Sequence, residues 1–245
     1  MKEKVIERGN IGVSTVRGAA VESNKGQVYE VRQIRAYRCK RAFDLIAASI
    51  GLVLAAPLAG IIALLIRLSG PGPVVFKQPR IGKDGKEFLF YKFRSMRVDC
   101  DDTSHREYIK LFIQGDEKAL EKYQHGRKLY KMTGDNRVTS VGRFLRRTSL
   151  DELPQLLNVL RGEMSMVGPR PHIPYEVDLY KDWHRRRLNG TPGITGWWQI
   201  HGRSRVTFDQ SVKMDIWYLE HQSLILDIRI MCRTITKAIV GRGAC

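Results

Sequence analysis

Two adjacent carboxylates, Asp151 and Glu152, stand in the segment of this chain that carries the most chemistry. From Arg146 to Pro171 the segment reads RRTSLDELPQLLNVLRGEMSMVGPRP, with arginines on both sides of the acid pair. Paired carboxylates can supply a nucleophile, a general acid or base, or ligands for a divalent cation. Arginine forks bind phosphate oxygens bidentately. The pattern indicates chemistry on a phosphorylated substrate; a plain helix cap with solvated arginines is the structural alternative.

The acid pair is predicted to lie at the start of a helix. Ser149 and Glu152 fit an S-x-x-E capping box, and the apolar run LPQLLNVL follows. Proline is tolerated only in the first turn, so Pro154 places the helix start between Ser149 and Asp151. Gly162 is expected to end the helix in the left-handed conformation. The positive end of the helix dipole would keep both carboxylates ionised.

A long apolar run, AFDLIAASIGLVLAAPLAGIIALLI, covers residues 42–66. As one straight helix it would extend about 37 Å, enough to cross a hydrocarbon core of about 30 Å, so a single crossing is the default reading. Pro57 interrupts the run, however, and basic residues flank both of its ends, which the positive-inside rule keeps on the cytoplasmic face. We therefore expect a helix–break–helix hairpin with arms of about 22 and 14 Å, each too short to cross.

The rest of the chain divides around this run. Residues 1–36 are polar and lack an apolar core, so they are expected to form a mobile tail rather than a signal peptide. Residues 37–69 form the membrane segment, and residues 70–245 a cytosolic catalytic domain. Within that domain, the charge-rich residues 99–131 predict an insertion of one or two surface helices. The run that begins at Ser223 predicts a basic amphipathic helix, for which a membrane interface and a packed core are both open.

The composition favours anionic partners. The chain has 245 residues, a formal net charge of +17, and four widely scattered cysteines with no C-x-x-C pair. Nucleic acid, anionic lipid and phosphorylated substrates all fit such a charge. A tethered nucleic-acid-binding protein or a lipid-binding scaffold would explain the charge but would give the acid pair no role. No zinc motif or nucleophile elbow is present, so the sequence does not support a metal or serine hydrolase.

Several ordered motifs together carry a family resemblance. They are KRAFDLI at 40–46, FKQPRIG at 76–82, YKFRSM at 91–96, GPRP at 168–171 and TPGITGWWQIHGR at 191–203. With the acid-pair segment, they closely resemble the monotopic phosphoglycosyl transferases, bacterial sugar transferases that load a sugar-1-phosphate onto a polyprenyl phosphate. The resemblance implies an α/β fold, helix-rich and irregular, with a re-entrant membrane helix hairpin and interfacial amphipathic helices. It also implies a place in one leaflet at the cytoplasmic face of the bacterial inner membrane.

The same resemblance implies the residue roles. Asp151 would attack the β-phosphate of a UDP-sugar, release UMP and pass the sugar-1-phosphate to polyprenyl (undecaprenyl) phosphate. Glu152 would bind Mg²⁺ with Asp151 or give acid–base support, and Arg146 and Arg170 would contact phosphate. The further substrate-binding candidates are Arg147, Gln199, Arg203, Arg80 and Lys92.

The partners expected from the resemblance are a UDP-sugar, polyprenyl phosphate and the membrane, with no nucleic acid. A homodimer is left open. The sugar cannot be read from the residues, because small changes in hydroxyl contacts separate one sugar from another. The C-terminal run is more similar to members that initiate exopolysaccharide or O-antigen chains, which favours a hexose-1-phosphate.

Overall fold

The computed structural model describes residues 19–22, 28–31, 36–97, 102–124, 137–202 and 205–240. The chain divides into two compact units, residues 1–33 and 34–245. In the first unit, β1 (Ala19–Glu22) pairs antiparallel with β2 (Val28–Val31). This short hairpin lies in the segment that the sequence predicts to be a mobile tail, and the mobility stays a prediction.

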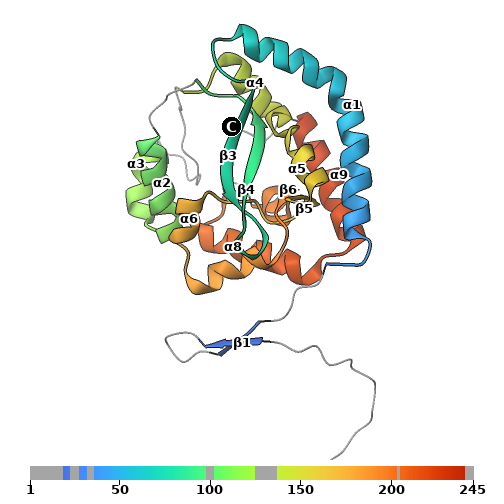
Figure 1. Cartoon of the computed structure of the whole chain (residues 1–245). Helices are drawn as coiled ribbons and strands as arrows, with labels where there is room; N and C mark the ends of the chain where they lie inside the picture. The colour runs from blue at the N-terminus through green and yellow to red at the C-terminus, as the bar shows by residue number, and fades with distance from the viewer. Residues whose placement is uncertain are drawn as a thin grey trace, which may run out of the picture. The chain divides into compact units, whose positions relative to one another are not determined.

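The second unit is rich in helices and holds two small sheets (Figure 1). Its helices are α1 (Lys40–Leu68), α2 (Thr103–Gln114), α3 (Glu117–Gln124), α4 (Ser140–Thr148), α5 (Gln155–Arg161), α6 (Pro174–Asp178), α7 (Trp197–His201), α8 (Phe208–His221) and α9 (Leu224–Val240). Among the described residues, 3-10 turns accompany them at η1 (Lys83–Gly85), η2 (Leu150–Glu152) and η3 (Asp182–Asn189). Strands β3 (Val75–Ile81) and β4 (Glu87–Phe93) pair antiparallel, and β5 (Ser165–Val167) pairs parallel with β6 (Gly193–Thr195). The expected helix-rich character is thus confirmed.

The apolar run forms one continuous helix, α1, which includes Pro57. In Figure 1, α1 rises along the right edge of the unit and curves over its top, so the helix bends without reversing. A proline removes one backbone hydrogen bond and displaces the carbonyl four residues earlier, which kinks a helix whose other hydrogen bonds remain. The structure therefore does not confirm the predicted break into two arms.

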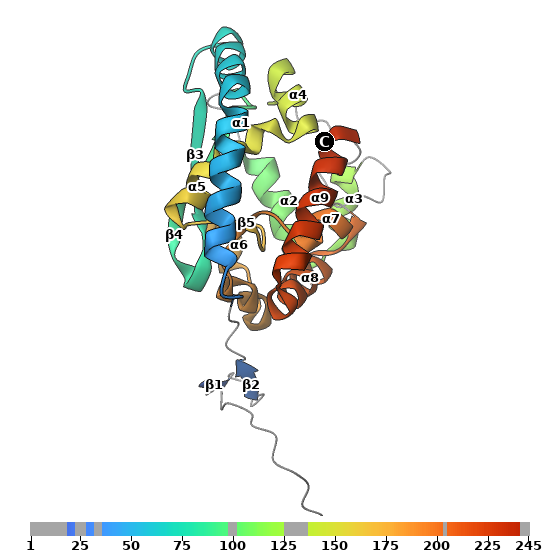
Figure 2. The ribbon, with the colours of Figure 1, turned by 90° about the vertical axis from the view of Figure 1, so that its right-hand side faces the viewer.

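Both ends of α1 are bound to the same folded unit. At its start, Lys40 Nζ donates to Asp227 of α9 at 2.7 Å, and both side chains are buried. At its end, the Arg94 guanidinium donates to the carbonyls of Ile66 at 2.9 Å and Gly70 at 2.6 Å. Arg94 thus bonds the Ile66 carbonyl, which belongs to the last turn of the helix, and the chain just beyond it. These contacts make α1 lie along the unit rather than project from it, as Figure 2 shows from the side.

The outward face of α1 is apolar and exposed. Val53, Leu54 and Leu68 are 73%, 75% and 75% exposed, whereas Ala48 and Ile62 on the inward face are buried. Among the described residues, α1 is the helix that is long and apolar enough to cross a membrane by length and composition. An apolar surface of this extent requires a nonaqueous neighbour or a partner.

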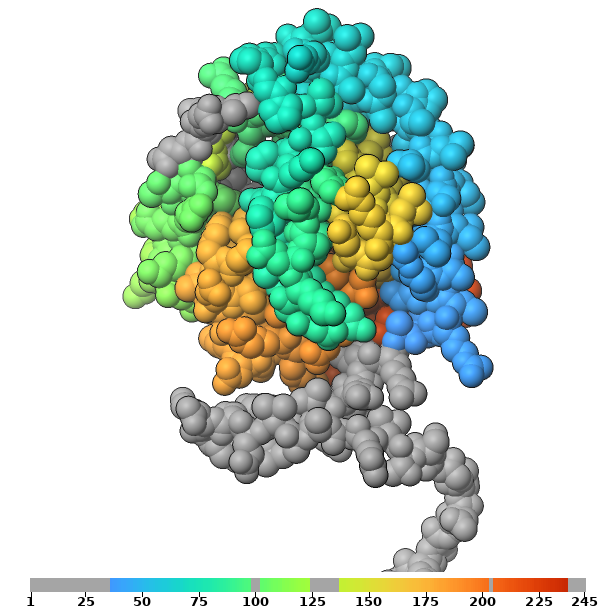
Figure 3. Space-filling model, viewed as in Figure 1, coloured from blue at the N-terminus to red at the C-terminus, as the bar shows by residue number. Residues whose placement is uncertain are grey.

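The β3–β4 hairpin and α5 lie side by side on one face of the unit (Figure 3). The buried amide of Asn158 joins them, because its Nδ2 donates to the Leu89 carbonyl at 2.7 Å and its Oδ1 accepts from the Tyr91 N–H at 3.1 Å. Phe90 of the hairpin and Leu156 of α5 pack in the same core cluster. The hairpin edge and the helix are thus held in fixed register.

The charge-rich segment contributes helices to the core. Helices α2 and α3 lie where residue spacing predicts them, and residues 99–101 and 125–131 of that segment lie outside the described residues. Tyr108 and Ile113 of α2 are buried, and Ile113 packs with Tyr180 and Phe208. Helix α2 therefore lies at the surface with its apolar face closing one side of a core cluster, and the assignment of the segment as an insertion stays a prediction.

The C-terminal helix begins as predicted. Ser223 Oγ accepts from the Leu226 N–H at 3.3 Å. Asp227 and Ile230 of α9 are buried, while Ile225 is 64% exposed. Helix α9 therefore has one core face, and its exposed face carries apolar side chains, so its place in a membrane interface stays a prediction.

Helix α4 approaches the chain at Ser95 closely. A Cβ on Gly142 would lie 1.9 Å from the Ser95 carbonyl oxygen, so only glycine fits there. Thr139 caps α4 by accepting from the Gly142 N–H at 2.9 Å, and Ser95 Oγ accepts from Arg146 Nε at 2.9 Å. This contact fixes where α4 presents Arg146.

We predict that Gly142→Ala destabilises the protein by about 1 to 3 kcal/mol, because the added methyl group overlaps the Ser95 backbone and must displace α4. Thermal unfolding in detergent measures the effect. Gly60→Ala is the matched control: a Cβ at Gly60 meets nothing within 4 Å, so that variant should be neutral or more stable. Equal unfolding temperatures for the two variants would contradict the packing argument.

Candidate active site

The acid pair lies on η2, between α4 and α5, and not at the start of a long helix. Ser149 has a φ of 59° and ends α4 in the left-handed conformation, and its side chain makes no capping hydrogen bond. An N-cap residue needs extended backbone, so the predicted capping box does not form. Helix α5 begins only at Gln155, after Pro154. The predicted left-handed cap at Gly162 is confirmed by its φ of 83°.

Basic side chains from separate elements converge on the acid pair. Arg170, which follows β5, forms an ion pair with Glu152, with 3.1 Å between NH1 and Oε1. Lys92 of β4 and Arg146 of α4 are, with Arg170, the cations with the largest effects on Asp151. The structure therefore brings together residues 59 positions apart in the chain, from Asp151 back to Lys92.

In this cluster the charged forms of both the acid and the base are disfavoured. Burial raises the pKa of Asp151 to about 6, Glu152 acts in the same direction, and the cations only partly offset them. Burial and the neighbouring arginines lower the pKa of Lys92 to about 8. A site in which the cations also repel one another gains stability when a phosphate group enters.

Arg80 of β3 forms the rear of the cluster. Its NH1 donates to the Pro171 carbonyl at 3.1 Å and its NH2 to Gln78 Oε1 at 2.8 Å. Burial lowers the pKa of Arg80 to about 10, and repulsion from the positive charge of Arg170 acts in the same direction. The guanidinium also lies over the Phe90 ring, 5.2 Å from its centroid. Arg80 therefore links the hairpin to the loop that carries Arg170.

A second layer of buried polar groups stands behind Arg80, and sequence patterns did not reveal it. Glu176 Oε2 lies 2.7 Å from His172 Nδ1, and His172 Nε2 lies 2.9 Å from a guanidinium nitrogen of Arg187. Arg187 in turn forms a buried ion pair with Asp215. Arg187 and His184 are both fully buried, although they stand in a run of charged residues.

Burial sets the charge states in this layer. Burial and the charge of Arg187 lower the pKa of His172 to about 4. For Glu176, burial raises the pKa, but His172 and Arg80 outweigh it and lower the value to about 2. At neutral pH the layer therefore holds a neutral imidazole beside an ionised carboxylate.

Two expected substrate-binding residues, Arg147 and Gln199, have surroundings different from those of the cluster. Arg147 is exposed on α4, and the charges with the largest effects on Asp151 do not include it. Gln199 Nε2 donates to the Ile194 carbonyl at 3.1 Å, which ties α7 to β6. Arg203 lies outside the described residues.

The acid pair could bind a magnesium ion only if a substrate supplied further oxygen ligands. Among the described residues, no group of three or more His, Cys, Asp or Glu side chains gathers to form a metal cage. Mg²⁺ needs few protein ligands, since one or two carboxylates together with substrate phosphates complete its octahedron. Asp151 and Glu152 lie next to each other, and burial raises the pKa of the Asp151 carboxyl to about 6, a shift that a bound cation would oppose. The donor set therefore fits.

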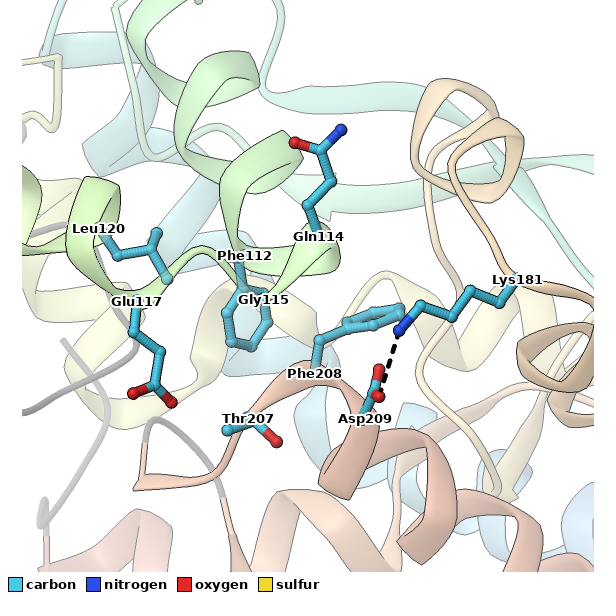
Figure 4. Close-up of a pocket in the computed structure, with 9 residues that line it drawn as sticks. All are labelled: Phe112, Gln114, Gly115, Glu117, Leu120, Lys181, Thr207, Phe208 and Asp209. Atoms are coloured by element: carbon cyan, nitrogen blue, oxygen red, sulfur yellow. Dashed lines mark hydrogen bonds and ion pairs between the residues drawn. The ribbon is translucent and has the colours of Figure 1, made fainter.

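A separate hollow of about 270 Å³ lies between the α2–α3 pair and the start of α8 (Figure 4). Its lining includes the rings of Phe112 and Phe208, with the Lys181–Asp209 ion pair at one side. None of the residues proposed from the sequence lines it. The hollow is therefore distinct from the acid pair and its cations.

An acid pair set among cations that suit phosphate groups defines a candidate phosphoryl-transfer site. The family profile described as bacterial sugar transferase matches residues 35–241. The chain therefore belongs to the bacterial sugar transferase family, as the sequence motifs indicated.

Individual relatives agree with this assignment. The chain is 42% identical over 205 residues to the exopolysaccharide production protein ExoY of Rhizobium meliloti, covering 84% of this chain and 87% of ExoY. It is 40% identical over 239 residues to the galactosyl transferase CpsE of Streptococcus agalactiae, covering 96% of this chain and 50% of CpsE. It is also 40% identical over 213 residues to the UDP-glucose:undecaprenyl-phosphate glucose-1-phosphate transferase of Escherichia coli, covering 84% of this chain and 41% of that protein. The chain thus spans half or less of the length of two of these relatives.

We predict that Asp151→Asn stabilises the folded protein at neutral pH by about 1 to 2 kcal/mol. Because folding raises the pKa of this carboxyl from 3.8 to about 6, ionisation costs the folded state more than the unfolded state. The gain should be complete above pH 6 and should vanish as the pH falls towards 3.8. Denaturant unfolding across this range measures it.

Asp178→Asn, which alters an exposed aspartate on α6, is the control and should change stability by less than about 0.5 kcal/mol. A loss of stability in Asp151→Asn at pH 7 would show that the carboxylate is fully compensated by its neighbours.

Proposed function

We propose that the chain transfers a sugar-1-phosphate from a UDP-sugar to polyprenyl phosphate. The observation that carries the proposal is the position of Asp151, half-buried beside Glu152 and surrounded by Lys92, Arg146 and Arg170. The name of the relative from E. coli supports it, since it specifies UDP-glucose and undecaprenyl phosphate. The names of ExoY and CpsE support a role in starting an exopolysaccharide or a related lipid-linked glycan.

The reaction would proceed in two displacements at one carboxylate. In the first, an Asp151 carboxylate oxygen attacks the β-phosphorus of the UDP-sugar. A bond forms between that oxygen and phosphorus, the bond to the bridging oxygen breaks, and UMP leaves with the electron pair. In the second, an oxygen of polyprenyl phosphate attacks the same phosphorus, which releases Asp151 and yields a lipid diphosphate sugar. Two displacements at one group predict ping-pong kinetics.

The surrounding cations would make the first displacement feasible. Two unit charges 4 Å apart repel by about 4 kcal/mol at an effective dielectric constant of 20, which corresponds to roughly a thousandfold in rate. Arg170, Lys92 and Arg146 reach the site from three different elements, so they would surround a diphosphate from several directions. Arginine forks would hold the nonbridging oxygens, and Lys92 would act as a point charge.

We propose that Asp151 and Glu152 also hold Mg²⁺ together with the phosphates of the substrate. The ion would supply positive charge to the phosphoryl oxygens that gain charge during the displacement. Glu152 would have to divide its two oxygens between the ion and Arg170, to which it is already bound at 3.1 Å. This division would hold Arg170 next to the bound phosphate.

We further propose that α1 lies in one leaflet at the cytoplasmic face of the bacterial inner membrane. The support is geometric, because Asp227 binds the first residue of α1 and Arg94 binds its last turn. A folded unit in water cannot hold both ends of a helix that crosses the bilayer. The exposed outer face of α1, with Val53 and Leu54 at its centre, would then contact the acyl chains.

Asp151 should be indispensable and should carry label in the absence of lipid. Incubation with a UDP-sugar labelled in its sugar should leave label on the wild-type protein, and Asp151→Asn should release no UMP and carry no label. The exposed Asp178→Asn serves again as the control and should retain full activity. Label that persists on Asp151→Ala would refute the assignment of the nucleophile.

The placement of α1 predicts that both of its ends are accessible from the same side. Cys39 is exposed just before α1, and Ser69 is exposed just after it. In cells and in inverted vesicles, a membrane-impermeant maleimide should modify Cys39 and a Ser69→Cys reporter from the cytoplasmic side, each tested with the other cysteines replaced by serine. Modification from opposite sides would establish a crossing instead.

The sugar is proposed to be a hexose, since the names of the relatives refer to galactose and glucose. A UMP-release assay with UDP-galactose, UDP-glucose and UDP-N-acetylglucosamine tests this. We expect the two unmodified hexoses to be turned over at least tenfold faster than the N-acetylated sugar. Faster turnover of UDP-N-acetylglucosamine would reject the hexose assignment while leaving the reaction itself intact.

A further inference from the structure

An acid of the apolar helix is bonded to the strand that leads to Arg170. Asp44 lies one turn after the start of α1, yet it is only 3% exposed. Its Oδ1 accepts from Ser165 Oγ and from the Met166 N–H, each at 2.9 Å. Ser165 and Met166 are the first two residues of β5. The carboxylate therefore joins α1 to β5 by two direct hydrogen bonds.

Asp44 occupies the edge of β5 that faces away from β6. In the described part of the chain, β5 pairs with β6 alone, through two residue pairs that flank Met166. The Met166 N–H therefore points away from β6, and a buried backbone N–H needs an acceptor, which Asp44 supplies. The Ser165 hydroxyl has one proton for two acceptors, and an ionised carboxylate is a stronger acceptor than the Val167 carbonyl, to which Lys40 already donates. Both donors of this edge are thus directed at one carboxylate oxygen.

The chain from β5 to the acid pair is short and bonded at each step. The Gly168 N–H donates to a carbonyl of β6, and the Pro169 carbonyl accepts from an N–H of β6, both at 2.8 Å. Arg170 follows at once, and its NH1 lies 3.1 Å from Oε1 of Glu152. No free residue separates β5 from Arg170, so a shift of the strand would move the guanidinium relative to the acid pair.

We propose that Asp44 is a positioning residue for phosphate binding, and that its carboxylate fixes β5 so that Arg170 meets Glu152 and the phosphates of the substrate. A sheet of two short strands is marginally stable by itself, so the register of β5 and β6 depends on what bonds their outer edges. Asp44 is the acceptor at the outer edge of β5. The inference rests on the proposed function, because it assumes that Arg170 binds the UDP-sugar.

Two substitutions of Asp44 separate its hydrogen bonds from its bulk. Asp44→Asn keeps Oδ1 as an acceptor for both donors. Asp44→Leu fills the space with an apolar side chain and leaves the buried Met166 N–H without a partner. We expect Asp44→Leu to bind UDP at least tenfold more weakly by calorimetry and to lose at least tenfold in kcat/KM for UMP release. Asp44→Asn should stay within about threefold of wild type in both measurements.

A merely structural role predicts a loss of stability without a loss of UDP affinity. Arg41→Ala is the matched control, because Arg41 ties the same end of α1 to α5 instead, by donating to the carbonyls of Val159 at 2.6 Å and Leu160 at 2.9 Å. It should lower the unfolding temperature and leave UDP affinity within about threefold of wild type. Unchanged UDP affinity in Asp44→Leu, an equal loss in Arg41→Ala, or equal losses in the two Asp44 variants would each overturn the proposal.

Ser165→Ala keeps the inference testable if Asp44→Leu fails to fold. It removes one of the two donors that reach Asp44 and leaves the Met166 bond in place. We expect UDP affinity to fall at least threefold, and unchanged affinity would overturn the proposal. Wild-type protein that neither binds UDP nor releases UMP would overturn the proposed function itself. Active wild type with unchanged UDP affinity in these variants would overturn only this inference.

Discussion

Repulsion among cations gathered around an acid pair is the constraint on which this structure depends. Arg80, Lys92, Arg146 and Arg170 come from a hairpin, a helix and a loop, and no one of these elements could hold such a cluster alone. The surrounding fold serves to oppose that repulsion: Gly142 lets α4 approach, Asn158 fixes α5 against β4, and the loop after β5 is bonded to β3.

A buried ion pair elsewhere in the protein has more hydrogen bonds than the carboxylate at the candidate site. The buried pair of Lys40 and Asp227 is fully surrounded by hydrogen bonds, two of them from Tyr37 and Tyr218. A buried ion pair needs such completion to be tolerated. Asp151 lacks it, which is why burial raises its pKa to about 6. Incomplete compensation of this kind is typical of a functional site, which supports the role proposed for Asp151.

Local patterns and motifs pointed to most residues of the candidate site but not to their geometry. The acid pair, Arg146, Arg170, Arg80 and Lys92 could be named because each lies in a motif of adjacent residues. The capping box was wrong because Ser149 is used to end the preceding helix, a choice that depends on how α4 packs. His172 and Glu176 were missed because they join the buried layer through each other and through Arg187, contacts for which the chain offers no short motif.

The two attachments of α1 have a mechanical consequence. Lys40 fastens its first turn to α9, and Arg94 fastens its last turn to the end of the β3–β4 hairpin, so the helix cannot swing or tilt independently of the folded unit. Arg94 follows Lys92 by two residues. Lys40 and Tyr218, which bind Asp227, also donate to the carbonyl of Val167 in β5, the strand that leads to Arg170. Under the membrane placement proposed above, the depth of the apolar helix would therefore set the height of the acid pair above the acyl chains, and the phosphate of the proposed lipid substrate would always meet Asp151 at the same level.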